Sequence, residues 1–297
     1  MGINSHPKDP SKAYLYAGLS VLFWSTAASA FKITLAHISF IQILFWATLA
    51  SCLALFFILL FQGRLYLIRQ TTRSELARSA MLGFLNPFLY YLVLLKAYTL
   101  LPAQVAQPLN FTWPLMLVLL SVPLLKQRLT LYSLLAMLIS FTGVYLISSE
   151  GTPFDMNFSD PQGILLALGS SVIWALFWIF SVSDRRHEVV KLFLSFLFAL
   201  GFIVVIMIFT SGFADMNLPG IAGGIYIGLF EMGFTFVFWL KALQFAVSSD
   251  RISNMIYLTP FLSLMLIHLV VGETLYMTTI AGLLLIVGGI VFQKIKG

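Results

Sequence analysis

Residues 38–62 read ISFIQILFWATLASCLALFFILLFQ, a stretch without a charged residue that is long enough to cross a bilayer as a helix. Comparable stretches follow one another along the 297-residue chain, of which 60% is hydrophobic and only 9% is charged. A soluble domain carries roughly 25% charged residues to wet its surface. The composition therefore excludes soluble, disordered and nucleic-acid-binding proteins, and it predicts an integral membrane protein whose constant partner is the lipid bilayer.

The gaps between charged residues predict ten membrane-spanning helices joined by short loops. These helices are expected at residues 13–35, 38–62, 77–99, 103–125, 130–148, 162–183, 189–211, 218–243, 251–271 and 275–293. The strict in–out alternation of barrel strands is absent, so the predicted fold class is all-α. The single cysteine, Cys52, excludes a disulfide framework, and we expect neither a metal site nor a cofactor.

The basic residues predict the orientation of the helices, because lysine and arginine are retained on the cytoplasmic side. If the N-terminus is inside, all 17 lysines and arginines except Lys32 and Lys96 fall in cytoplasmic segments. Those two residues lie at outer helix ends. Both terminal segments, residues 1–12 and 294–297, are therefore expected in the cytoplasm, and the net charge of +6 reflects topology.

The chain contains two related halves. A shift of 145 residues brings Leu95-Lys96-Ala97 onto Leu240-Lys241-Ala242, and a shift of 146 brings Pro114 onto Pro260. Each half holds five predicted helices, and because five is odd, the two halves must cross the membrane in opposite directions.

The predicted architecture is thus an inverted five-plus-five repeat. The first repeat covers residues 13–148, the second covers residues 162–293, and a periplasmic linker joins them at 149–161. Inverted repeats recur in secondary transporters, where the substrate site lies near the midplane between the halves.

Three short motifs in this arrangement resemble a known family. They are Leu22-Phe23-Trp24-Ser25-Thr26, Asn110-Phe111-Thr112-Trp113-Pro114 and Ser171-Val172-Ile173-Trp174-Ala175. The whole chain resembles the EamA family of the drug/metabolite transporter superfamily, and the motifs are similar to those of bacterial aromatic amino acid exporters. The resemblance implies a bacterial inner-membrane protein that exports amino acids and related small metabolites, with aromatic amino acids as a family-level expectation.

A carboxylate near the middle of the eighth predicted helix is the clearest functional signal. A polar group at this depth of the membrane costs free energy, so a polar residue there is expected to have a specific role. Glu231 corresponds to Asn86 in the first repeat, and the two side chains are expected to face each other across a central cavity. Glu231 can serve as the counter-charge for a substrate ammonium or as the carrier of a coupling proton. The structural alternative is a protonated carboxyl that is hydrogen-bonded between helices.

The remaining candidate residues are amides, aromatic side chains and prolines. Gln107, Asn110 and Trp113 recur at helical spacing and are expected to share one face. The full predicted substrate-binding set is Trp24, Asn86, Tyr90, Asn110, Trp113, Trp174, Glu231 and Tyr257. The predicted hinges are Pro87, Pro114 and Pro260, because proline removes a backbone donor from a helix; the alternative is that they only kink packed helices.

These features predict a secondary transporter that works by alternating access around the central site. No nucleophile–base pair and no phosphate-binding loop is visible in the sequence, so enzymatic activity is not expected. An exporter of lipophilic or quaternary cations would use Glu231 and the tryptophans equally well. A non-transporting membrane scaffold is the alternative from another class. The oligomeric state stays open, a monomer included.

Overall fold

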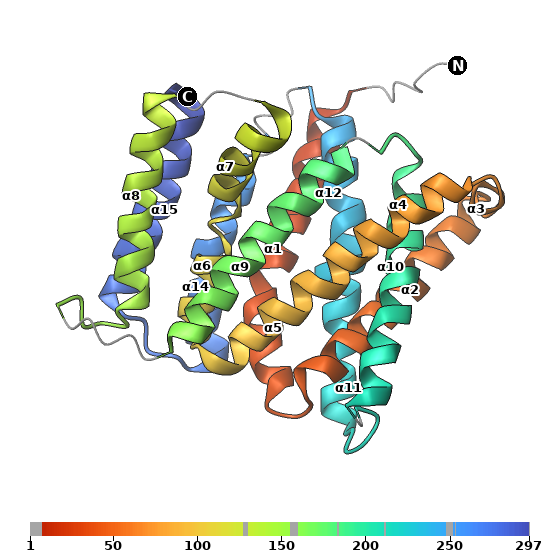
Figure 1. Cartoon of the computed structure of the whole chain (residues 1–297), viewed down its shortest axis with the longest axis horizontal. Helices are drawn as coiled ribbons and strands as arrows, with labels where there is room; N and C mark the ends of the chain where they lie inside the picture. The colour runs from red at the N-terminus through yellow and green to blue at the C-terminus, as the bar shows by residue number, and fades with distance from the viewer. Residues whose placement is uncertain are drawn as a thin grey trace.

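The computed structural model describes residues 8–126, 130–154, 160–182, 184–210, 212–247, 252 and 254–296, and this part of the chain consists of helices joined by loops, without a strand (Figure 1). Its elements are α1 (Pro10–Leu35), α2 (Phe40–Phe61), α3 (Tyr66–Arg69), α4 (Arg73–Gly83), η1 (Phe84–Leu89), α5 (Tyr90–Leu100), α6 (Ala103–Asn110), α7 (Trp113–Leu125), α8 (Leu131–Ser148), α9 (Pro161–Val182), α10 (Glu188–Phe209), α11 (Leu218–Ile227), η2 (Gly228–Gly233), α12 (Phe234–Phe245), η3 (Met255–Leu258), α14 (Thr259–Leu266), η4 (Ile267–Val271) and α15 (Met277–Lys296). Parts of the predicted terminal segments and linker, and the basic residues Arg128 and Arg251, lie outside the described residues.

The predicted all-α membrane fold is confirmed. Within the described residues, nine helical stretches are long and apolar enough to cross a membrane, and a tenth, shorter apolar stretch covers Met255–Val271. Several predicted helices are composite: α4, η1 and α5 form the third span, for example, and α11, η2 and α12 form the eighth. The start of α1 and the end of α15 lie at the same end of the bundle (Figure 1), as an even number of crossings requires.

The start of the first helix and the loop after the second span differ from the prediction for local reasons. The first helix begins at Pro10 and not at residue 13, because the Asp9 carboxylate caps it by accepting a 3.1 Å hydrogen bond from the Lys12 amide. The short helix α3, between the second and third spans, was not predicted, since four residues are too few to produce a visible apolar pattern.

Equivalent helices of the two halves make equivalent contacts with the opposite half. The third span of the first half packs on α10 through α4 and η1, and the eighth span of the second half packs on α2 through α11 and η2. In the same way α1 packs on α12 and α14, while α9 packs on α5 and α7. The fifth and tenth spans, α8 and α15, pair at one edge of the bundle (Figure 1). This correspondence is what an inverted repeat produces.

Glycines mark the closest crossings of this arrangement. A Cβ atom on Gly83 would collide with the backbone of Ser195 in α10, and one on the repeat-equivalent Gly228 would collide with the backbone of Ala47 in α2. Gly143 lies at the crossing of α8 with α15, where a Cβ atom would come within 2.5 Å of the Gly282 carbonyl oxygen. Small residues at such crossings let helix backbones approach closely within a membrane.

Polar contacts join several loops at the end of the bundle where α1 begins. The Asp9 amide donates to the Phe245 carbonyl at 3.0 Å, and the Gln244 amide donates to the Glu188 carboxylate at 2.7 Å. In the loop before α10, Arg186 donates to both oxygens of the buried Asp184 carboxylate. Burial raises the pKa of Asp184, but these hydrogen bonds lower it more, so the net pKa lies below its ordinary value.

Candidate functional site

Two interrupted helices position the candidate site. The π-helical segments η1 and η2 occupy equivalent places in the third and eighth spans, and each carries one of the predicted polar residues, Asn86 or Glu231. At Asn86 the backbone leaves helical geometry altogether, with φ −148° and ψ 124°. Such π segments inside α-helices occur frequently at functional sites, because they redirect side chains that a regular helix would turn elsewhere.

The Glu231 carboxylate has one oxygen that is bonded and one that is not. Its Oε1 atom accepts a 3.0 Å hydrogen bond from the Tyr91 hydroxyl, whereas its buried Oε2 atom has no hydrogen-bond partner among the described residues. The Trp24 indole donates to the Glu231 backbone carbonyl at 3.3 Å. Within the described part of the chain the recorded ion pairs are Lys12 with Asp9 and Arg186 with Asp184, so this carboxylate lacks a cationic partner.

A series of polar side chains connects Glu231 to the other half of the bundle. The Tyr91 ring lies edge-on to Tyr90, with centroids 4.7 Å apart. The Tyr90 hydroxyl donates to the Asn110 side-chain oxygen at 3.2 Å, and the Asn110 amide donates to the Ser170 hydroxyl at 2.8 Å. These five residues, here called the central network, join η2, α5, α6 and α9.

Aromatic rings cover one side of the central network. Trp174 lies 4.7 Å from Tyr90 and 5.8 Å from Phe236 between ring centroids. Phe236 in turn lies 6.0 Å from Trp24, whose ring is 5.4 Å from Trp239. Trp24, Trp174, Phe236 and Trp239, here called the aromatic wall, come from α1, α9 and α12. Cations held beside aromatic faces gain cation–π attraction, so this wall suits a cation with an apolar group attached.

The structure brings together Trp24, Tyr90, Asn110, Trp174 and Glu231 of the predicted set. Asn86 is fully buried, and neither its amide oxygen nor its nitrogen has a hydrogen-bond partner among the described residues. Its side chain thus has no recorded link to the central network. An unsatisfied buried polar group costs about 1–3 kcal/mol, so this amide is primed for a ligand or a water molecule.

Trp113 and Tyr257 occupy a different environment from the rest of the predicted set. Both are half-buried and pack against the hydrophobic core, and no hydrogen bond joins either of them to the central network in the described part of the chain. In the structure these two residues pack against the hydrophobic core.

The predicted continuous face of the fourth span does not form. The span divides at Phe111–Thr112 into α6 and α7, because Pro114 in the first turn of α7 has no amide to continue the ladder. Asn110 and Trp113 therefore belong to separate helices. The ninth span divides in the same way before Pro260, which begins α14 after the 3₁₀ segment η3.

The sequence interpretation missed four residues of the site. Tyr91 is fully buried and supplies the hydroxyl that reaches Glu231, and Ser170 accepts from the Asn110 amide. Phe236 lies between Trp24 and Trp174, and Trp239 packs against Trp24. A tyrosine beside the predicted Tyr90 and a serine one turn before Trp174 were visible in the sequence. Phe236 carried no signal, since phenylalanine is abundant throughout the chain.

Comparison with known proteins identifies relatives over the whole chain. The sequence profile of the EamA-like transporter family matches residues 11–149 and again residues 161–293. An uncharacterized transporter of Archaeoglobus fulgidus is 25% identical over 283 residues, which cover 94% of this chain and 97% of the relative. The uncharacterized transporter YvbV of Bacillus subtilis is 26% identical over 220 residues, which cover 72% and 70% of the two chains. A solved crystal structure with 21% identity has the same fold, with a TM-score of 0.66 over 97% of this chain and 99% of that one.

Proposed function

Because the chain belongs to the EamA-like transporter family, we propose that it exports amino acids and related small metabolites by alternating access. The chain is a multi-pass membrane transporter, and its small-molecule substrate would bind at the central network. We further propose that the chain lies in a bacterial inner membrane with both termini in the cytoplasm, an orientation that its basic residues support.

The unpartnered oxygen of Glu231 carries the proposal. A carboxylate at this depth is costly to bury unless a cation or a proton neutralises it, and the described residues place no lysine or arginine against it. A substrate ammonium would supply the missing charge and bond the free Oε2 atom. The hydroxyl of Tyr91 holds the other oxygen and so fixes the direction of the carboxylate.

The other parts of a zwitterionic substrate also find complementary groups. The free amide of Asn86 and the amide of Asn110 offer donors to a substrate carboxylate. The aromatic wall offers an apolar surface for a side chain, which favours amino acids with large apolar or aromatic side chains.

Binding at this site requires movement of the two halves. In the described conformation Tyr91, Ser170 and Asn86 are fully buried, and the Trp174 side chain is 9% exposed, so the side chains pack against one another. A substrate would enter when the halves rock apart at the helix interruptions that adjoin Pro87, Pro114 and Pro260. Each proline then acts as a hinge at which backbone hydrogen bonds are already missing.

Counterflow in proteoliposomes tests the substrate class. Vesicles that contain the full chain are loaded with one unlabelled amino acid at a time, and the uptake of labelled phenylalanine is followed. We expect amino acids with apolar side chains to drive uptake, because they fit both the carboxylate and the aromatic wall. Vesicles without protein provide the background.

A lipophilic cation is the second candidate substrate, because Glu231 and the aromatic wall alone would bind one. Tetraphenylphosphonium is therefore included as a competitor in the same assay. If no amino acid drives uptake while vesicles exchange labelled tetraphenylphosphonium, the amino acid proposal is wrong and the cation takes its place.

A further inference from the structure

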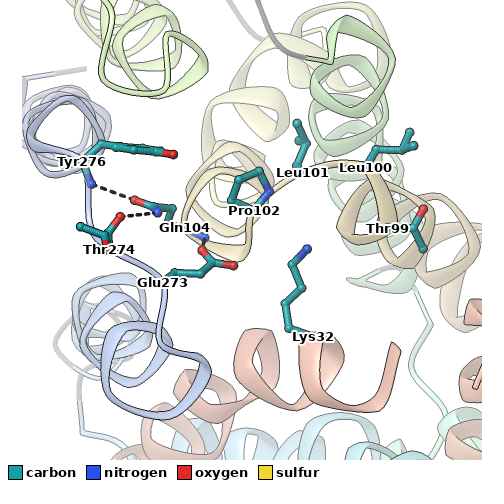
Figure 2. Close-up of a pocket in the computed structure, with 9 residues that line it drawn as sticks. All are labelled: Lys32, Thr99, Leu100, Leu101, Pro102, Gln104, Glu273, Thr274 and Tyr276. Carbon is teal, nitrogen blue, oxygen red and sulfur yellow. Dashed lines mark hydrogen bonds between the residues drawn. The ribbon is translucent and has the colours of Figure 1, made fainter. Parts of the chain in front are cut away.

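A polar pocket opens at the opposite end of the bundle from the start of α1. Its volume is about 490 Å³, and its lining includes Lys32, Thr99, Gln104 and Glu273 (Figure 2). Pockets that bind small molecules commonly measure roughly 300–1,000 Å³. On the proposed orientation, this end of the bundle faces the outside of the cell.

Opposite charges face each other across this pocket. In Figure 2 the Lys32 side chain extends from α1 into the pocket, and the Glu273 carboxylate approaches from the other side. The two groups form no ion pair with each other within the described residues, and both line the pocket. A pocket with an ammonium on one side and a carboxylate on the other is complementary to a zwitterion.

Each charged group is held by hydrogen bonds and can still form further ones. The Lys32 ammonium donates one hydrogen bond, at 2.9 Å, to the Tyr98 carbonyl, and an ammonium has three donors. The two Glu273 oxygens accept from the amides of Ala103 and Gln104 at 2.7 and 3.0 Å, and each oxygen retains a lone pair. The Gln104 side chain bonds the backbone of Thr274 and Tyr276, which fixes the loop that carries Glu273.

Two helices run from the pocket to the candidate site. Lys32 follows Trp24 of the aromatic wall on α1 by two turns, or about 12 Å of rise, and Gln104 precedes Asn110 of the central network on α6 by about 9 Å. The pocket thus lies between the candidate site and this end of the bundle, at about one to two turns of helix from the site.

We propose that this pocket is an outer subsite for the zwitterionic head group of the transported amino acid. Lys32 binds its carboxylate and Glu273 binds its ammonium. The inference rests on the proposed function, since it assigns the same substrate to a second position on its path. The subsite holds the substrate after release from Glu231 and before it reaches the external solution.

The test uses a reporter cysteine in the pocket. Thr99→Cys in a Cys52→Ser background is reconstituted as the full chain, and the rate of its modification is measured with an anionic and a cationic methanethiosulfonate reagent. We expect the anionic reagent to react faster, and Lys32→Met to slow it about tenfold because the attracting charge is lost. Phenylalanine should slow modification, whereas phenethylamine, which lacks the carboxylate, should not.

Lys96→Met is the matched control, because it removes a second lysine that the sequence places at the same membrane face. The Lys96 ammonium lies 5.7 Å from the Phe40 ring centroid, and Lys96 is not among the residues that line the pocket. Lys32→Arg retains the charge and should retain protection by phenylalanine, which separates loss of charge from loss of folding.

The outcomes distinguish the subsite from the central site. Protection by phenylalanine that is lost in Lys32→Met and kept in Lys96→Met supports the proposal. If phenylalanine gives no protection, or if protection is unchanged in Lys32→Met, the subsite is overturned even when amino acid counterflow is intact. If protection follows Lys32 but no amino acid supports counterflow, the pocket still binds an amino acid, but the proposed function and the place of the pocket on a transport path are overturned.

Discussion

Replacement of Glu231 by glutamine is expected to abolish amino acid counterflow. Glutamine retains an oxygen that accepts from the Tyr91 hydroxyl, but it removes the charge that would bind the substrate ammonium. Loss of one member of a buried charged pair costs about 2–5 kcal/mol, so the rate at a fixed substrate concentration should fall about a hundredfold. The measurement is the initial rate of labelled phenylalanine uptake into preloaded proteoliposomes.

Glu188→Gln is the control for this experiment. It makes the same chemical change at the end of the bundle, where the Glu188 carboxylate accepts from the Gln244 amide at 2.7 Å, far from the central network. We expect near-normal counterflow from this variant. Elution of both variants as folded protein in size-exclusion chromatography excludes misfolding as the cause. Normal counterflow in Glu231→Gln would show that substrate binding does not need the Glu231 carboxylate.

Two neighbouring glycines in α15 should differ in how much the same substitution lowers the thermal stability of the protein. A Cβ atom on Gly289 would lie 2.7 Å from the Ala136 carbonyl oxygen in α8, whereas one on Gly288 would meet nothing within 4 Å. Overpacking of a tight contact costs about 1–3 kcal/mol, and backbone atoms cannot move aside as a side chain can. We therefore expect Gly289→Leu to lower the thermal denaturation midpoint by about 5 °C or more.

Gly288→Leu is the matched control, because it introduces the same side chain one residue away on the exposed face of α15. Its denaturation midpoint in detergent should stay close to that of the unaltered protein. Equal effects of the two substitutions would show that helix propensity, and not the crossing of α8 with α15, determines the result.

Much of the fold could be predicted from the long segments that lack charged residues. The membrane spans follow from apolar length, and the inverted repeat follows from motifs such as Leu95-Lys96-Ala97 and its second copy. The interruptions could be predicted only in part. Pro87 signals the interruption in the third span, but Gly228–Gly233 forms its π segment without a proline, where it packs on α2. No local pattern in the sequence records such a tertiary contact.

The residue types of the candidate site could be predicted more readily than the contacts among them. Polar and aromatic residues at membrane depth pointed to Trp24, Asn110 and Glu231. In the structure Trp24 bonds the Glu231 backbone, and Asn110 is linked to Glu231 through Tyr90 and Tyr91. Which of Tyr90 and Tyr91 reaches Glu231 could not be predicted, because the preceding π segment shifts the helical face away from the regular 3.6-residue period. The placement of Lys32 and Glu273 in the lining of one pocket could not be predicted for another reason: they lie 241 positions apart, and only tertiary packing brings them to the same pocket.

Alternating access requires the central network to be a substrate site that is exposed in turn to each side of the membrane. Ser170→Cys in a Cys52→Ser background places a thiol of similar size in this network, where Ser170 is fully buried. An impermeant maleimide is applied to oriented proteoliposomes from one side and then from the other, with and without phenylalanine. We expect the thiol at position 170 to be modified from both sides of the membrane, and phenylalanine to slow its modification from either side. Modification from one side only under every condition, or modification that phenylalanine leaves unchanged, would contradict this expectation.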